Sequence, residues 1–287
     1  MRFERSEVKL GGAGNVANNL AALGIRVEAV GLLGRDSAGR RIRELCRRAG
    51  IETRGLLSHA GHESPIKTRI LAGAVQTTRQ QLLRIDRGGI LTDPALREEV
   101  AVAAEEAARR ADVVVISDYG GGIAGLAVAR RARRWARRQP VCVDSRYALS
   151  IFEGVTVAKP NLPELLALMG GGGAEALTFA AFVRAGRRLL AKQRWGALLV
   201  TRGQDGLALL ESGKPPRSWP VHGSTEAVDV TGAGDTVLAV FAAALAATGE
   251  LALAAELANV AGGLVVQKPG TATISAAELE AALASPR

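Results

Sequence analysis

The chain has 287 residues, 48% of them hydrophobic and 23% charged, which is enough for one large α/β domain or for one domain with a small appendage. No run of about twenty apolar residues lacks a charge or a glycine, and residues 1–10 have no apolar core, so we expect neither a membrane span nor a secretory signal. Cys46 and Cys142 fall in helix-like and strand-like segments, which predicts buried, reduced thiols in a cytoplasmic protein.

The net charge of +9 comes mostly from arginine, and the densest cluster covers residues 130–138. Nucleic acid is one partner that such a cluster suggests. Only 3% of the chain is aromatic, too little for a base-stacking surface, so we favour the solvent face of an ordinary helix and expect no nucleic-acid partner. A basic surface also suits an enzyme whose ligands are phosphorylated.

The first part of the chain combines α/β elements with an irregular stretch. Apolar residues recur at helical spacing from Val16 to Leu23, and Gly24 can end that helix. The predicted elements are a strand at 7–10, a helix at 11–23, a strand at 26–34 and a helix at 40–49. Residues 64–87 alternate and carry β-type side chains, which indicates two or three strands outside the α/β rhythm.

The α/β rhythm then resumes and continues to the end of the chain. The predicted helices cover 93–110, 124–138, 161–168, 178–193, 232–247, 250–267 and 276–284. The predicted strands cover 112–117, 141–144, 154–161 and 197–203, with a hairpin-like stretch at 206–212 and a flexible glycine connection at 170–173. Because helices and strands alternate, we predict a mostly parallel, doubly wound sheet with helices on both faces.

The stretch DVTGAGDTVLAVFAAAL at 229–245 places Thr-Gly-Ala-Gly-Asp before a long apolar helix. The first N–H groups of a helix have no internal partner, and Gly232 and Gly234 let a ligand approach them closely. The helix dipole adds positive potential there, so the stretch predicts a phosphate site. Asp235 would compete with a bound anion, which indicates a base held beside a phosphate that is being transferred.

A rival interpretation comes from Gly12, Gly14 and Ala17, which match the dinucleotide pattern G-x-G-x-x-A after a predicted strand. It would make the chain an NAD(P)-dependent oxidoreductase. That plan needs an acidic residue at the end of the second strand, but Glu28 lies inside its strand. No G-x-x-x-x-G-K-[ST] motif occurs, so a P-loop kinase is excluded.

Two further polar segments, KPNLPE at 159–164 and VTRG at 200–203, follow predicted strands, and ligands bind at the carboxyl ends of strands in open α/β sheets. Asn161 and Glu164 lie one helical turn apart, and an amide with a carboxylate suits Mg²⁺ bound through water. The alternative is structural: Asn161 caps the helix and Glu164 completes a capping box.

The segments GGAGNVANNLAALG and DVTGAGDTVLAVFAAAL together resemble the two signatures of the PfkB/ribokinase family of carbohydrate kinases, and the resemblance covers nearly the whole chain. It implies a single ribokinase-like domain over 1–287, with a small β lid at about 5–10 and 64–87 that pairs two subunits. It also implies ATP and Mg²⁺, and transfer of the γ-phosphoryl group to a sugar hydroxyl. A non-catalytic remnant that still binds nucleotide is the alternative within this fold.

Within the family, the chain is most similar to the heptose 7-phosphate kinases, through KTRILAGAVQTTRQQLLRID, VVVISDYGGG, KPNLPELLALMG and ANVAGGLVVQKPGTATIS. This similarity implies phosphorylation of heptose 7-phosphate at its anomeric position, a step toward ADP-heptose and lipopolysaccharide precursors. Another sugar of the family is the alternative acceptor.

The resemblance also implies site residues, position by position. Asp235 resembles the catalytic base, and Gly232, Ala233 and Gly234 resemble the anion hole. The segment Asn161, Leu162, Pro163 and Glu164 resembles the nucleotide-phosphate motif, with Glu164 on Mg²⁺ through water. The implied nucleotide pocket further includes Thr201, Gly203, Thr231 and Asn259. The implied sugar-binding residues are Gly11, Gly12, Asn15, Lys67 and Asp118.

The sequence departs from the heptose kinases at three places. Gly121 and the Ser145–Arg146 pair stand where those kinases carry lysines, which predicts an altered pocket for the sugar phosphate. The family's first strand, which carries an aspartate for the sugar hydroxyls, would precede residue 1. We therefore expect that strand to be missing, and a chain extended upstream to be more stable and more active, unless residues 7–10 fill the gap.

Overall fold

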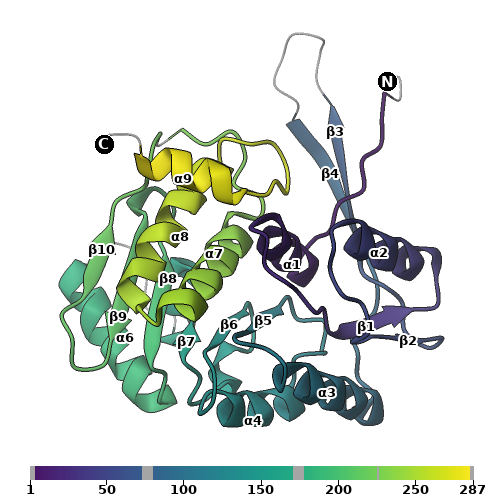
Figure 1. Ribbon diagram of the computed structural model, residues 1–287, viewed down its shortest axis with the longest axis horizontal. Coiled ribbons are helices and arrows are strands. Elements are labelled where there is room, and N and C mark those ends of the chain that lie inside the picture. Colours follow the sequence, from purple (N-terminus) through teal and green to yellow (C-terminus); the bar gives the residue numbers. More distant parts are fainter. Residues whose placement is uncertain (1–3, 73–79, 171–177, 225, 285–287) are drawn as a thin grey trace.

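The structure is a computed structural model that describes residues 4–72, 80–170, 178–224 and 226–284 (Figure 1). Its main sheet has the strand order β10-β9-β8-β7-β6-β5. The strands are β5 (Val114–Asp118), β6 (Val141–Ser145), β7 (Val157–Ala158), β8 (Ala197–Thr201), β9 (Leu207–Glu211) and β10 (Arg217–Trp219). β5 to β8 run parallel, whereas β9 and β10 are each antiparallel to the preceding strand.

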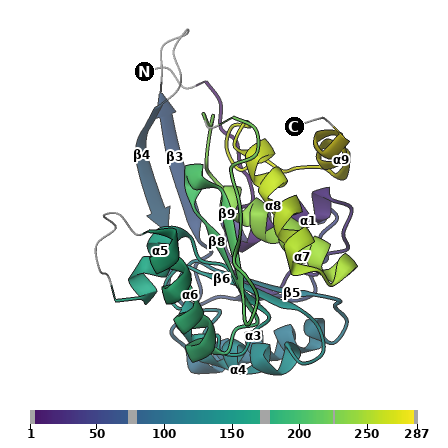
Figure 2. The ribbon, with the colours of Figure 1, turned by 90° about the vertical axis from the view of Figure 1, so that its left-hand side faces the viewer.

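Helices cover both faces of this sheet, as the alternation of elements predicts (Figure 2). One face carries α1 (Ala13–Ala22), α7 (Ala233–Thr248) and α8 (Leu251–Val265), with α9 (Ala276–Ala284) against α8. The other face carries α3 (Pro94–Ala108), α4 (Leu126–Trp135), α5 (Leu162–Leu168) and α6 (Phe179–Gln193). Successive residues of a strand point to opposite faces, so Leu199 enters the first core and Leu198 the second.

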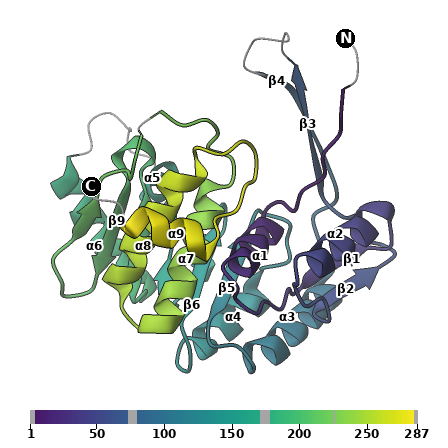
Figure 3. The same ribbon diagram turned by 45° about the horizontal axis from the view of Figure 1, so that its top comes forward.

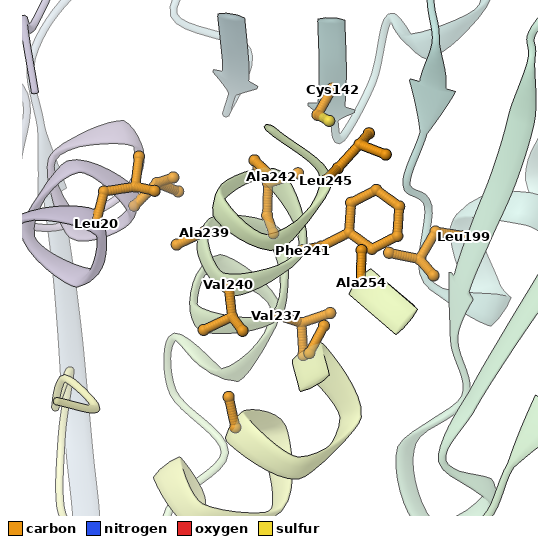
Figure 4. Packing of buried hydrophobic residues seen from close by; sticks show 14 of the residues in the cluster. Leu20, Cys142, Leu199, Val237, Ala239, Val240, Phe241, Ala242, Leu245 and Ala254 are labelled. Atoms are coloured by element: carbon orange, nitrogen blue, oxygen red, sulfur yellow. The ribbon is translucent and has the colours of Figure 1, made fainter. Parts of the chain in front are cut away.

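The helix that begins at the Thr-Gly-Ala-Gly-Asp stretch lies at the centre of the first core. In Figure 4, Phe241 of α7 points toward Leu199 of β8, and Leu20 of α1 lies on the opposite side of the helix. Phe241 and Leu238 are fully buried. Burying a large apolar side chain contributes about 1.5–3 kcal/mol, so α7 is fixed firmly and its N-terminus is a rigid platform.

A second region lies beside the main sheet and consists of two small sheets. β1 (Gly31–Gly34) and β2 (Leu56–His59) pair in parallel, with α2 (Ser37–Arg48) between them in the chain. β3 (Ile66–Ala72) and β4 (Gln80–Arg87) form an antiparallel hairpin that projects from the body (Figure 3). Among the described strands, β1 pairs only with β2, and β5 pairs only with β6.

Several expected strands differ from the structure. Residues 4–10 run without regular secondary structure, and Leu10 is buried in the first core while Val8 is 54% exposed. That segment is therefore held by the burial of Leu10 and not by backbone hydrogen bonds to a neighbouring strand. The expected lid strand at 5–10 is wrong. The strand expected at 154–161 shrinks to Val157–Ala158, and Pro160, which has no N–H for a ladder, lies just after its end.

The arginines of the basic cluster at 130–138 are mostly exposed, as expected of the solvent face of a helix, and the partly buried one is Arg131. Arg131 forms an ion pair with Glu98, Arg134 lies 3.5 Å from Glu105, and Trp135 Nε1 donates to Glu105 at 2.8 Å. Part of this cluster thus serves packing between helices.

In the part of the chain that the structure describes, the helices are too short or too polar to cross a membrane. Cys46 and Cys142 are buried and free, as predicted. Residues 171–173 of the predicted glycine connection lie outside the described residues.

Candidate active site

Asp235 occupies the first turn of α7, whose N-cap is Gly232. Its carboxylate is held at both oxygens: Asn15 Nδ2 donates to Oδ2 at 2.8 Å, and the Tyr119 hydroxyl donates to Oδ1 at 2.8 Å. The residue is only 3% exposed. The structure therefore brings the predicted base together with the predicted sugar-binding amide of α1.

A buried polar network supports Asn15 from behind. Asn19 Nδ2 donates to the Asn15 carbonyl at 2.9 Å, and the Thr236 hydroxyl donates to Asn19 Oδ1 at 3.0 Å. Asn15, Asn19 and Thr236 are all buried, so each needs such partners. The network fixes α1 against α7 and thereby sets the direction of the Asp235 carboxylate.

Gly232 has two reasons to be glycine. Its φ is +83°, a left-handed conformation that side-chain-bearing residues rarely adopt. A Cβ atom there would lie 2.5 Å from Asn15 Nδ2, too close for any contact. The glycine thus lets the amide that holds Asp235 pass directly over the N-cap of α7.

The N-terminus of α7 offers its backbone unevenly. Ala233 donates its N–H to the Val230 carbonyl at 3.2 Å, so it is not available for an anion. Within the described residues, the N–H of Gly234 donates to no backbone acceptor. With the helix dipole, the first turn keeps the character of an anion site, although Ala233 contributes less than we expected.

Burial raises the pKa of Asp235, because a charged carboxylate is poorly solvated there. The hydrogen bonds from Asn15 and Tyr119 act in the opposite direction, the charge of Asp144 adds to the rise, and the charge of Lys159 opposes it. A carboxylate with a raised pKa is a better general base near neutral pH than an exposed aspartate.

Tyr119 and Lys67 form the mouth of the site. The Tyr119 ring would lie 3.3 Å from a Cβ atom on Gly12, whose φ is +54°, so ring and glycine backbone are in close contact. Lys67 Nζ of β3 lies 5.4 Å from the centroid of the same ring, within the range of a cation–π contact. Tyr119 itself is 41% exposed, although its hydroxyl reaches the buried Asp235.

Asp118 serves the loop that carries Tyr119. Its Oδ1 accepts from the N–H of Gly120 at 3.0 Å, and its Oδ2 accepts from the Ser145 hydroxyl at 2.7 Å. Both oxygens are thus engaged within the protein. The structure supports a positioning role for Asp118 more directly than the sugar-binding role that we expected.

The segment from Asn161 to Glu164 lies at the end of β7. Asn161 Oδ1 accepts from the N–H of Glu164 at 2.8 Å, and Glu164 Oε2 accepts from the N–H of Asn161 at 2.9 Å. The structural alternative, a capping box, is therefore present, with Leu162 and Pro163 inside its first turn. Burial raises the pKa of Glu164, and the charge of Asp144 adds to that rise.

The remaining nucleotide-pocket residues lie on neighbouring elements. Thr201 ends β8 and forms a parallel bridge with Asn161, and Gly203 follows it with φ +59°. Thr231 donates its N–H to Asp229 at 2.8 Å, which shapes the turn before α7. Asn259 of α8 donates to the Pro220 carbonyl at 2.8 Å, so its side chain is tied to the connection after β10.

Sequence reasoning did not assign roles to three side chains at this site: Tyr119, Asp144 and Lys159. Lys159 Nζ pairs with Asp144 Oδ2 at 2.7 Å, and the Lys159 side chain is 3% exposed. Asp144 lies in β6 and Lys159 directly follows β7. A signal was present, because both are charged residues at the carboxyl ends of adjacent parallel strands, where ligands bind.

A model of the pfkB family of carbohydrate kinases matches residues 1–278. This chain belongs to that family. The "Bifunctional protein HldE" of Pseudomonas aeruginosa (strain LESB58) is 40% identical over 286 residues, covering 99% of this chain and 57% of that protein. The protein of the same name from Caulobacter vibrioides is also 40% identical, over 98% of this chain and 57% of its own length. The chain thus spans a little over half the length of these curated relatives.

Solved structures agree on the fold. The ribokinase of Arabidopsis thaliana, complexed with ribose and ATP, has a TM-score of 0.75 at 23% identity, covering 95% of this chain and 86% of that one. The phosphofructokinase-2 of Escherichia coli, in complex with potassium, has a TM-score of 0.76 at 20% identity, covering 94% of this chain and 85% of that one. The predictions of a ribokinase-like fold and of a carbohydrate kinase are confirmed.

The oxidoreductase interpretation of Gly12 and Gly14 is wrong, since the family match covers this segment. The structure adds a physical reason. Glu28, the only acid that we considered for the ribose, forms ion pairs with Arg54 and Arg110 at 2.9 Å. It is therefore neutralised within the protein and not directed at a ligand on α1.

Proposed function

We propose that the chain transfers the γ-phosphoryl group of ATP to the anomeric hydroxyl of heptose 7-phosphate. The proton of that hydroxyl goes to Asp235, and the hydroxyl oxygen bonds to the γ-phosphorus. The bond between that phosphorus and the bridging oxygen breaks, and ADP leaves. Phosphoryl transfer of this kind depends on positioning and charge stabilisation. The fixed carboxylate positions the acceptor hydroxyl, and the helix N-terminus beside it supplies positive potential for the phosphoryl group.

Mg²⁺ suits the nucleotide side of the site. No group of three or more His, Cys, Asp or Glu side chains that could hold a metal occurs within the described residues. Mg²⁺ needs no such group, because it keeps several waters and binds through one or two carboxylates plus substrate phosphates. Glu164, half-buried at the end of β7, would hold it through water. The ion, when bound, neutralises charge on the nucleotide phosphates.

The observation that carries the choice of a phosphorylated sugar is the position of Lys67. Its amine lies over the ring whose hydroxyl binds the catalytic carboxylate, so a cation stands one tyrosine ring away from the base. Arg146 stands over the Tyr147 ring at 5.6 Å, beside the same loop. These cations suit a sugar phosphate. The motif likeness and the 40% identity to HldE support heptose as the sugar.

An ADP-release assay across acceptors tests the proposal. The panel is heptose 7-phosphate, fructose 6-phosphate, fructose and ribose, each with ATP and Mg²⁺. We expect heptose 7-phosphate to give the highest kcat/KM, with weak binding because two lysines are absent. A much higher kcat/KM for an unphosphorylated pentose or hexose would contradict the heptose assignment and leave the family assignment intact.

The lid hairpin supports a homodimer as the working form. The β3–β4 register puts Ile66, Ile70, Leu83 and Ile85 on one face. Ile70 and Leu83 are directly paired and are 41% and 51% exposed. Lys67 and Arg69 lie on the opposite face, and the charge of Arg69 helps to lower the pKa of Asp229 near α7. The polar face thus points to the site, and the apolar face suits a second copy of the lid.

ATP as the phosphoryl donor favours the cytoplasm as the place of reaction. The two free, buried cysteines are consistent with that reducing compartment.

A further inference from the structure

Lys159 is a buried cation that the proposed reaction has not yet used. It directly follows β7, its residue surface is 2% exposed, and its amine pairs with Asp144 Oδ2 at 2.7 Å. Its backbone N–H donates to the Val143 carbonyl at 2.8 Å, which fixes the start of the side chain on the sheet. The amine therefore has a defined position at the carboxyl edge of the strands.

The pair with Asp144 is poorly explained by stability alone. Removing two charges from water is costly, and apolar residues of similar size often stabilise such a position as well or better. A buried ion pair at the ligand-binding edge of an α/β sheet is therefore better explained by chemistry than by folding.

Gly234 connects this amine to the phosphate site. A Cβ atom on Gly234 would lie 3.6 Å from Lys159 Nζ, so the amine faces the first turn of α7 from very close by. The charges of Lys159 and Asp144 act on Asp235 and also on Glu164. The pair thus lies between the catalytic base and the segment assigned to the nucleotide phosphates.

We propose that Lys159 is a further catalytic residue, which binds the oxygens of the γ-phosphoryl group while that group passes from ATP to the sugar. Asp144 holds the amine in place beside Gly234 before the nucleotide binds. The inference rests on the proposed kinase reaction but not on the identity of the sugar. Lys159 takes part in no proton transfer: the acceptor proton goes to Asp235, the new O–P bond forms, and the bond to the ADP oxygen breaks.

Lys159→Met tests this role, with Lys214→Met as the matched control. Lys214 pairs with the buried Glu211 at 2.6 Å. Glu211 is the last residue of β9 and lies opposite the first residue of β8, so Lys214 is at the edge of the sheet opposite to the carboxyl ends of the parallel strands. Both variants remove an amine from a carboxylate whose side chain is at most 16% exposed, and only Lys159 lies beside Gly234. We expect kcat to fall by at least about a hundredfold in Lys159→Met, the scale of losing one transition-state donor. We expect Lys214→Met to keep its kcat.

Nucleotide affinity separates this role from a purely structural one. Titration calorimetry compares ADP with a non-hydrolysable ATP analogue, which carries the γ-phosphate. We expect the affinity of Lys159→Met for the analogue to fall about tenfold relative to its affinity for ADP, the scale of one charge-assisted hydrogen bond. If Lys159→Met does not fold, the double variant Lys159→Met/Asp144→Asn, in which neither residue of the pair is charged, is titrated in its place. This titration is done without Mg²⁺, and we expect the same fall of the analogue affinity relative to the ADP affinity.

Two results would overturn the role of Lys159. One is a kcat of Lys159→Met within about threefold of the kcat of the parent chain, because the loss of a transition-state donor lowers kcat by far more than that. The other is an analogue-to-ADP affinity ratio equal to that of the parent chain. If the parent chain phosphorylates a sugar other than heptose 7-phosphate, only the proposed identity of the acceptor is wrong. The kcat values of Lys159→Met and the parent chain are then compared with that sugar.

Discussion

Tyr119 donates its hydroxyl proton to Oδ1 of Asp235 at 2.8 Å, and so joins the loop after β5 to the first turn of α7. Burial raises the pKa of Tyr119, and the negative charge of Asp235 raises it further, so the hydroxyl remains a donor across the working pH range. The same hydrogen bond favours the ionised form of Asp235. Tyr119 thus helps to keep a buried carboxylate in its basic form.

Replacing Tyr119 with Phe removes that hydrogen bond and leaves the ring. Asn15, Asp144 and Lys159 still act on Asp235, and burial then raises the Asp235 pKa with less opposition. Because the base works as a carboxylate, activity is lost as the pH falls through this pKa. We expect the acid limb of the kcat/KM profile to move about one unit to higher pH, the scale of one hydrogen bond to a charged group.

Tyr147→Phe is the matched control for this measurement. The chain has two tyrosines. Tyr147 is 74% exposed, lies against Gly120 of the loop that carries Tyr119, and has its ring beneath Arg146. Its hydroxyl is not bonded to Asp235, whose two side-chain donors are Asn15 and Tyr119. The acid limb of Tyr147→Phe should match that of the parent chain. An unmoved limb in Tyr119→Phe would show that Tyr119 does not tune the base.

Asp235→Asn keeps the size and polarity of the base but cannot accept the proton. We expect turnover to fall at least about a hundredfold, the usual scale for loss of a general base. Nucleotide binding should stay close to that of the parent chain, because the α7 backbone is unchanged. Steady-state kinetics and nucleotide titration check the two statements, and near-normal turnover would remove Asp235 from the mechanism.

The sequence was informative wherever function depends on a local pattern. The glycine run before α7 predicted a helix N-terminus with little side-chain bulk, and Asp235 is buried within its first turn. Helix α1 followed from apolar spacing, and the strand rhythm of 112–201 predicted the parallel sheet. These features are set by neighbours a few positions apart in the chain, which a sequence shows directly.

Other features depend on contacts between distant segments. Asn15 meets Asp235 only because α1 packs on α7, and Lys159 meets Asp144 only because β6 and β7 are adjacent. Residues 4–10 can form a strand only beside a neighbouring strand whose backbone groups are unpaired. Their own sequence does not show whether such a neighbour exists. The capping box at Asn161 was visible in the sequence, but the pattern alone did not separate capping from metal binding.

Gly232→Ala tests the close approach at the N-cap of α7. A left-handed backbone costs alanine about 1–2 kcal/mol, and the new methyl group would also displace the Asn15 amide that holds Asp235. We expect a lower free energy of unfolding together with a large loss of kcat. Gly249→Ala is the control, because Gly249 has φ +70° at the other end of the same helix and open space around its Cβ position.

The control should lose stability by about the same 1–2 kcal/mol of backbone strain but keep its kcat. Denaturant unfolding and kinetics on both variants separate the two effects. Equal kcat values for Gly232→Ala and Gly249→Ala would mean that the Asn15–Asp235 contact does not depend on the missing Cβ at position 232.

Ile70→Lys tests whether the lid pairs two copies of the chain. Ile70 faces Leu83 across the hairpin on its apolar side, away from Lys67, so a charge there disfavours burial against a second lid without touching the site. Val102→Lys is the control, because Val102 is 45% exposed on α3, which lies on the side of the body away from the projecting hairpin (Figure 1). In sedimentation velocity we expect a dimer for the parent chain and for Val102→Lys, and a monomer for Ile70→Lys. A dimer that survives Ile70→Lys, or a monomeric parent chain, would rule out the lid as the dimer interface.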